Sequence, residues 1–189
     1  MDKDVWQREL VNLIGSEREA HSLSVSCTAL KLAKIAGEDL NKTAVAAYLH
    51  DCGKLKNNKL IFDTIRGYDI ILDQTTKQNI QLQHAVLGRY MAQDRFRISD
   101  VDILNAIRYH TTGRENMSML EKIVFVADGI DAGRHYDGVE KIREVAFEDL
   151  ERGLICLLEH TLNYLKRNNN QIHANTVKAL AWYKKRRRL

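Results

Sequence analysis

The sequence contains no proline, and only ten of its 189 residues are glycine. Because these two residues mark turns and chain breaks, their scarcity favours long helices joined by polar loops. It also excludes collagen-like, proline-rich and linker-rich proteins. No apolar run approaches the ~18 residues that a membrane span needs, and the charged residues 1–6 lack the apolar core of a signal peptide. We therefore expect no membrane partner.

Cysteine is scarce as well. The three cysteines, Cys27, Cys52 and Cys156, are far apart and form no C-x-x-C motif. An odd and widely spaced set argues against a disulfide framework and against a thiolate zinc site. The cysteines therefore predict a reducing, cytoplasmic location.

The net charge of +4 has its source at the C-terminus, where residues 184–188 are all Lys or Arg. Removing these five positive charges from +4 leaves −1 for the rest of the chain, so its body is not a basic nucleic-acid binder. We favour a solvated helix end, whose cations complement the helix dipole. Weak contact of this tail with nucleic acid or with an anionic lipid is the alternative.

Apolar residues recur at helical spacing over nearly the whole chain, and no alternating strand pattern stands out. A first helix is predicted to close at Ile14, and a second carries His21 and stops at Gly37. Asn41 is expected to cap a third helix, and residues 52–68 are expected to form a long functional loop. Further helices are predicted at about 80–94, 100–109, 117–128, 139–166 (with a break) and 173–186, and residues 167–171 are predicted as a polar loop or helix break.

Asp128 stands out because it follows the apolar run of residues 123–127. A carboxylate in such a run is costly to bury unless it is paired or binds a metal. A metal would explain it, and an ion pair with Lys122 or Arg134 is the alternative. Other residues able to join it at a metal lie on or beside predicted helices: His21, His50, Asp51, His84 and His110.

The order His21, then His50-Asp51, then Asp128 is similar to the H…HD…D signature of the HD-domain metal-dependent phosphohydrolases. Longer stretches resemble the YqeK branch of these enzymes: His21-Ser22-Leu23, Leu49-His50-Asp51-x-x-Lys54, residues 105–114 (NAIRYHTTGR) and residues 117–128. The resemblance implies an all-α, HD-domain helical bundle. It implies a single domain over residues 1–189, with a metal-site core at about 16–135 and C-terminal helices at about 139–189 packed on it.

The resemblance further implies one divalent metal, held by His21, His50, Asp51 and Asp128. This mixed nitrogen and oxygen set suits Fe²⁺, with Mn²⁺ as the alternative. Orientation of His50 by Asp51, without direct ligation, stays open. The implied reaction is symmetric cleavage of diadenosine tetraphosphate to two ADP by a metal-activated water.

The implied catalytic residues are Asp51, His84 and His110. We favour contact of the two histidines with phosphate, where one of them could also protonate the leaving nucleotide. A second metal or simple packing are the alternatives for this pair. Further groups are expected to bind the anionic substrate: Arg18, Lys54, Thr111, Arg114, Arg134, Asn170, Gln171, His173 and Asn175.

Two rival functions remain open. A nucleotidase or deoxynucleotide phosphohydrolase would use the same metal site, whereas a nucleotide- or RNA-binding module would use the basic tail and no catalysis. The HD-GYP enzymes are disfavoured because Gly67-Tyr68 is followed by Asp69. The expected partner is a dinucleoside polyphosphate or a nucleotide, and the choice between a monomer and a homodimer stays open.

Overall fold

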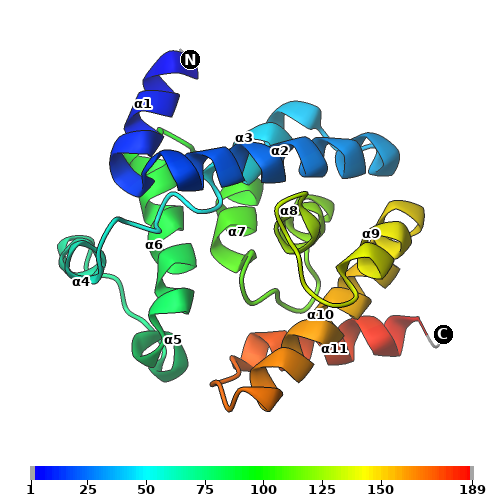
Figure 1. Ribbon diagram of the computed structural model, residues 1–189. Coiled ribbons are helices and arrows are strands. Elements are labelled where there is room, and N and C mark those ends of the chain that lie inside the picture. Colours follow the sequence, from blue (N-terminus) through cyan, green and yellow to red (C-terminus); the bar gives the residue numbers. More distant parts are fainter. Residues whose placement is uncertain (1–2, 188–189) are drawn as a thin grey trace.

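Helices supply all the regular secondary structure of residues 3–187, the part of the chain that this computed structural model describes. In chain order they are α1 (Lys3–Ile14), α2 (Ser16–Ala36), α3 (Leu40–Leu49), α4 (Asn58–Gly67), α5 (Gln74–Gln78), α6 (Ile80–Arg95), α7 (Val101–Tyr109), α8 (Met119–Ile130), α9 (Val139–Glu148), α10 (Leu150–Arg167) and α11 (Ala174–Arg186) (Figure 1). The predicted all-α fold class is confirmed.

The centre of the molecule is a group of helices packed around α8. Helix α2 packs against α3 and α8, while α7 packs against α3, α6 and α8. Helix α8 is buried along nearly its whole length, as its residues from Ile123 to Ala127 show, and forms the middle of the core. Helices α4 and α5 flank α6 on one side, and α9, α10 and α11 lie on the other side of α8 (Figure 1).

The C-terminal helices pack on this centre in sequence, because α10 contacts α8 and α9, and α11 contacts α10. The break predicted within residues 139–166 falls at Asp149, whose side chain accepts a hydrogen bond from the amide of Arg152 at 2.9 Å and so caps α10. The predicted division of the domain into a core and C-terminal helices stays a prediction.

Two local predictions need correction. The cap of α3 is Asp39, whose carboxylate accepts from the amides of Asn41 and Lys42 at 2.7 and 3.0 Å, so Asn41 lies inside the helix. Residues 52–68 are not one loop, since they contain α4, capped by Asn57. Leu60, Ile61 and Ile65 lie at helical spacing, so the sequence does carry a signal for α4, although only Ile61 of the helix is buried. The short helix α5 was also not predicted.

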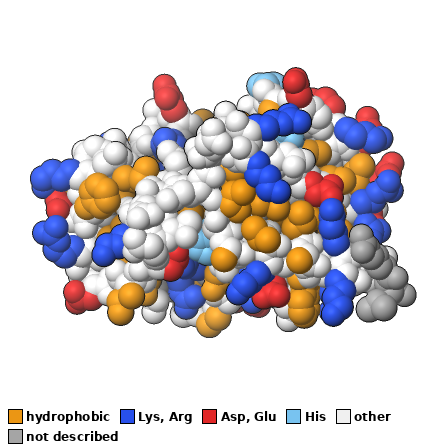
Figure 2. Space-filling model, turned by 90° about the horizontal axis from the view of Figure 1, so that it is seen from below, with side chains coloured by type: hydrophobic (Ala, Val, Ile, Leu, Met, Phe, Trp, Pro, Cys, Tyr) orange, Lys and Arg blue, Asp and Glu red, His pale blue; other side chains and the backbone are white. Residues whose placement is uncertain are grey.

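The basic C-terminal segment lies at the end of α11. Lys184 forms an ion pair with Glu159, and Arg187 forms one with Asp149 at 2.5 Å, so α10 neutralises part of its charge. Figure 2 shows basic and acidic side chains interspersed on the face seen there. Arg188 lies outside the described residues. No helix in the described part of the chain is long and apolar enough to cross a membrane.

Candidate metal centre and active site

Four histidines and two aspartates meet between the central helices. They come from five helices that are far apart in sequence: His21 from α2, His50 and Asp51 from the end of α3, His84 from α6, His110 from the end of α7 and Asp128 from α8. These six residues are called the metal cluster below. Three overlapping sets of them place their candidate ligand atoms within 4.8 Å of one another. The fold thus brings together every histidine and aspartate that the sequence analysis assigned to the centre.

His50 and His110 are held in the same way. Each directly follows a helix, α3 or α7, and each Nδ1 lies 2.7–2.8 Å from the carbonyl oxygen three residues earlier, that of Ala47 or Ile107. A carbonyl only accepts, so Nδ1 must carry the proton in both rings. In the neutral imidazole, Nε2 then carries a lone pair, which faces the cluster. This arrangement is typical of histidines that bind metals.

The first half of the metal cluster contains His21, His50 and Asp128. His21 Nε2 lies 3.1 Å from Asp128 Oδ1, and His50 Nε2 lies 3.8 Å from the same oxygen and 3.6 Å from Asp51 Oδ2. His50 is fully buried, yet its Nε2 has no hydrogen-bond partner in the described chain. Burial lowers the pKa of His50, so its ring is neutral at pH 7. An unpaired imidazole nitrogen beside two carboxylates fits a divalent cation.

The second half contains His84 and His110, with Asp51 between the halves. His84 Nε2 lies 3.0 Å from His110 Nε2 and 3.2 Å from Asp51 Oδ1, and His110 Nε2 lies 3.4 Å from that oxygen. Burial lowers the pKa of His84 to about 4. Burial opposes ionisation of Asp51, but the surrounding imidazoles outweigh it and hold the pKa of this carboxyl well below its usual range. Asp51 is therefore an anion shared by both halves.

A glycine makes the close approach of α3 and α6 possible. A Cβ on Gly53 would lie 2.2 Å from the carbonyl oxygen of His84 and 2.6 Å from the amide nitrogen of Gly88, both backbone atoms of α6. Any side chain at this position would push the end of α3 away from α6. Gly53 therefore sets the distance between Asp51 and His84.

Two cations border the metal cluster. Lys54 Nζ lies 3.0 Å from Asp51 Oδ2, and Arg134 Nη2 lies 2.5 Å from Asp128 Oδ1. Burial opposes ionisation of Asp128, but His21, His50 and Arg134 together lower the pKa of its carboxyl. The Arg134 pair considered for Asp128 is thus present, whereas Lys122 pairs with Glu151 at 3.5 Å. Lys54 and Arg134 both retain exposed surface, so they can also meet an anion.

Asp131 is a functional candidate that the sequence analysis missed. It is 1% exposed, and its Oδ2 accepts from Ser24 Oγ at 2.9 Å and from the amide of Gly133 at 3.0 Å. The same oxygen lies 3.8 Å from His21 Nδ1, on the side of the ring opposite Asp128. Asp131 therefore orients His21. Its place one helical turn after Asp128 was the available signal.

Comparison with known proteins agrees with this geometry. Residues 18–133, more than half of the chain, match the family model of the HD domain. The chain belongs to the HD-domain family. It is 39% identical to the symmetrical bis(5'-nucleosyl)-tetraphosphatase of Halalkalibacterium halodurans over 85% of each chain. It is 35% identical to the protein of that name from Bacillus subtilis, over 87% of this chain and 88% of the relative.

A solved structure supports the same assignment. It is described as a predicted HD superfamily hydrolase involved in NAD metabolism from Clostridium acetobutylicum. It is 36% identical to this chain, with a TM-score of 0.93 and coverage of 98% of both chains. Together these relatives confirm the predicted family and its YqeK-like branch.

The other residues predicted to bind the substrate differ in whether they already form contacts within the fold. Arg114 donates two hydrogen bonds, at 2.6 and 2.7 Å, to the buried carboxylate of Glu121. Thr111 has a buried Oγ1 without a hydrogen-bond partner in the described chain. Arg18 is exposed on α2, three residues before His21. The geometry thus engages Arg114 in the fold and leaves Arg18 exposed.

The segment predicted to bind the nucleotide, at the start of α11, contacts α5. Gln171 Nε2 donates to Gln78 Oε1 at 2.9 Å, and His173 Nε2 lies 3.3 Å from Asp73 Oδ2. His173 Nδ1 accepts from the amide of Asn175 at 3.1 Å and caps α11, while Asn170 is exposed. These residues form a bridge between α5 and α11. Their contact with a substrate stays a prediction.

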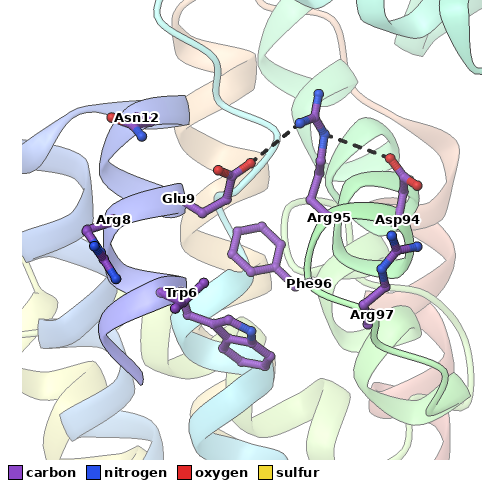
Figure 3. Close-up of a pocket in the computed structure, with 9 residues that line it drawn as sticks. Trp6, Arg8, Glu9, Asn12, Asp94, Arg95, Phe96 and Arg97 are labelled. Atoms are coloured by element: carbon purple, nitrogen blue, oxygen red, sulfur yellow. Dashed lines mark ion pairs between the residues drawn. The ribbon is translucent and has the colours of Figure 1, made fainter. Parts of the chain in front are cut away.

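A cavity of about 880 Å³ lies apart from the metal cluster, between α1 and the end of α6 (Figure 3). Arg95 points to Glu9 at 3.6 Å and to Asp94 at 3.8 Å across it. Trp6 packs edge-on against Phe96 at its base, with ring centroids 5.6 Å apart. This cavity includes none of the metal cluster residues, so we do not assign the reaction to it.

Proposed function

We propose that this HD-domain protein is a metal-dependent hydrolase that cleaves diadenosine tetraphosphate symmetrically to two ADP. The metal cluster is the observation that carries the proposal, because it gathers four imidazoles and two carboxylates, four of these six residues are buried, and the His50 Nε2 atom among them has no partner in the described chain. The named relatives support the substrate and the symmetric outcome, since three of them are 31–39% identical over 85–88% of this chain.

The proposed metal ligands are His21, His50, Asp51 and Asp128, and the proposed metal is Fe²⁺, with Mn²⁺ as the alternative. The residues fit such an ion because His50 Nε2 is buried and unpaired, and because two carboxylates lie within 3.8 Å of it. When bound, a divalent ion acts as a Lewis acid that lowers the pKa of water and offsets charge on a phosphoryl oxygen.

The protein's own histidines then act on the phosphates. His110 presents Nε2 to the cluster because its Nδ1–H is held by the Ile107 carbonyl. In the imidazolium form Nε2 carries a second proton, which lies within reach of Asp51 and can be given to the oxygen of the leaving ADP or donated as a hydrogen bond. His84, neutral at pH 7, positions His110 and Asp51 through its Nε2.

The cations and polar groups around the cluster bind the rest of the substrate in this proposal. Lys54 and Arg134 are the first choice because they already contact the cluster carboxylates and remain partly exposed. Arg18, Thr111 and Arg114 extend the phosphate site. The segment of Asn170, Gln171, His173 and Asn175 contacts a base or ribose. The unpaired thiols of all three cysteines support the proposed cytoplasmic location.

Product chromatography after incubation with diadenosine tetraphosphate tests the proposal. We expect two ADP per substrate from the metal-loaded protein, and no turnover from Asp128→Asn. The matched control is Asp137→Asn, which changes an exposed aspartate outside the cluster and keeps activity. Formation of ATP and AMP would contradict symmetric cleavage. A preference for mononucleotides over the dinucleotide would contradict the proposed substrate.

A further inference from the structure

A second cavity, of about 630 Å³, opens between α1, α2 and α3. Helix α2 contributes Glu19, Leu23 and Ser26 to its wall, three residues that share one helical face. His21 is about 200° around the helix from Glu19, at 100° per residue, and points to the metal cluster. Helix α2 therefore separates this cavity from the metal centre, and the metal cluster does not account for its residues.

Glu19 is the unusual group of this cavity. Glu19 is only 6% exposed, and it lines the cavity wall. Its Oε1 accepts from Tyr48 Oη at 3.0 Å and from Gln7 Nε2 at 3.3 Å, and both donors are neutral. No ion pair in the described part of the chain includes Glu19. A buried carboxylate without a positive partner is costly, and a bound cation would offset that cost.

The position of Glu19 at the start of α2 suits a cation beside it. Glu19 lies in the first turn of α2, where the helix dipole favours a negative charge. A carboxyl group at this place in the cavity wall favours a positively charged ligand.

The remaining wall has the chemistry of a site for an organic cation. Trp6 and Tyr48 supply aromatic rings, and Leu23 and Val45 supply apolar surface. No Lys or Arg is among the described residues that line the wall. Asp4 adds a second carboxylate to the lining. Aromatic faces and carboxylates together attract ammonium groups. The volume is in the range of sites that take small molecules.

We propose that this cavity binds a small organic ammonium ion with an apolar body. The ammonium group meets the Glu19 carboxylate, and the body lies against Trp6 and Leu23. This inference does not rest on the proposed hydrolase function, since none of the metal cluster residues lines the cavity.

Phenethylammonium and its neutral analogue 2-phenylethanol are suitable probes for the full-length protein. Fluorescence of Trp6 reports binding in a Trp182→Phe background, because these are the only two tryptophans of the chain. We expect saturable quenching by phenethylammonium and affinity for 2-phenylethanol lower by about tenfold or more. Equal affinity for the two probes, or no saturable change with either, would overturn the proposal.

Glu19→Gln tests the carboxylate itself, since it keeps the side-chain shape and removes the charge. We expect the affinity for phenethylammonium to fall about tenfold or more. Glu17→Gln, which changes an exposed glutamate of the same helical turn, should leave it unchanged. Unchanged binding by folded Glu19→Gln would reject the site. Trp6 also lines the first cavity, so a second variant is needed if Glu19→Gln fails to fold. Ala44→Leu fills only the cavity between α1, α2 and α3 and should abolish the quenching, whereas unchanged quenching would reject the site.

Discussion

The metal cluster and the polar groups around it are held in different ways. His50, Asp51 and His110 are at most 2% exposed and are fixed by the ends of α3 and α7. Asn170 and Gln171 are exposed, and a single amide contact links Gln171 to α5. The cluster is therefore organised before any ligand arrives, whereas the surrounding groups can adjust to the ligand. Substitutions in the metal cluster should therefore have larger effects than substitutions in the groups around it.

The largest effect is expected for Asp51→Asn. Asp51 faces both halves of the cluster, and the amide would remove the charge that His50, His84 and Lys54 surround. We expect kcat/KM for diadenosine tetraphosphate to fall by at least about three powers of ten. Near-normal kcat/KM in a folded Asp51→Asn protein would show that the cluster is not the active site.

A smaller loss is expected for His110→Ala, which separates phosphate chemistry from metal binding. If His110 serves the phosphates, the variant keeps its metal and kcat falls by roughly two to three powers of ten. A pH–rate profile then distinguishes a proton donor from a hydrogen-bond donor. Loss of one of two metal equivalents would instead assign His84 and His110 to a second metal.

Lys54→Met tests whether the cations that border the metal cluster bind the substrate. Lys54 Nζ is within hydrogen-bond distance of Asp51 and keeps exposed surface, so its loss should weaken substrate binding more than chemistry. We expect KM to rise about tenfold with a smaller change in kcat. Lys56→Met, two residues away and exposed, is the matched control and should change neither constant. Equal effects of the two variants would remove Lys54 from the site.

The smallest effect is expected at the bridge between α5 and α11. Burial opposes ionisation of Asp73, but hydrogen bonds from Thr76 and the contact with His173 outweigh it and lower the pKa to about 2. Because the folded pKa lies below the unfolded one, the carboxylate stabilises the fold above pH ~4 and this contribution is lost as the pH falls through 2. Asp73→Asn should therefore reduce the free energy of unfolding at pH 6 by less than about 1 kcal/mol.

Denaturant unfolding at pH 6 and pH 3 measures this contribution. The difference between Asp73→Asn and the wild type should shrink at pH 3, while that for exposed Asp137→Asn should stay constant. A difference for Asp73→Asn that is independent of pH would contradict the proposed role of its charge.

The metal cluster was readable from the sequence through the resemblance to the H…HD…D signature, and only Asp128 stood out by its apolar surroundings as well. Asp128 follows a buried run, which predicted a metal or an ion pair beside it, and the structure places both His21 and Arg134 there. Asp131 was not readable in this way, since an aspartate after a helix resembles any surface residue. The burial of Asp131 depends on Ser24 of α2, which donates a hydrogen bond to it. It also depends on the loop after α8, because Arg143 of α9 donates hydrogen bonds to the carbonyls of Ile130, Asp131 and Arg134.

The prediction of helices from the sequence was limited in the same way. Those that bury a broad apolar face, such as α8, were predicted within about two residues. Helix α4 was missed because residues 52–68 as a whole are polar and mixed, although Ile61 and Ile65 within them lie at helical spacing. Asn41 was chosen as a cap because it resembles Asp39 in chemistry and lies two residues away, and only the backbone geometry separates them. Local patterns therefore predicted the core, but not its exposed connections.

The metal content of anaerobically purified protein tests the central claim most directly. We expect about one equivalent of a divalent transition metal in the wild type and almost none in His50→Ala. His160→Ala is the matched control, because His160 stacks on Tyr136 outside the metal cluster, and it should keep the full equivalent. Full metal content in a folded His50→Ala protein would contradict the proposed centre and the mechanism that depends on it.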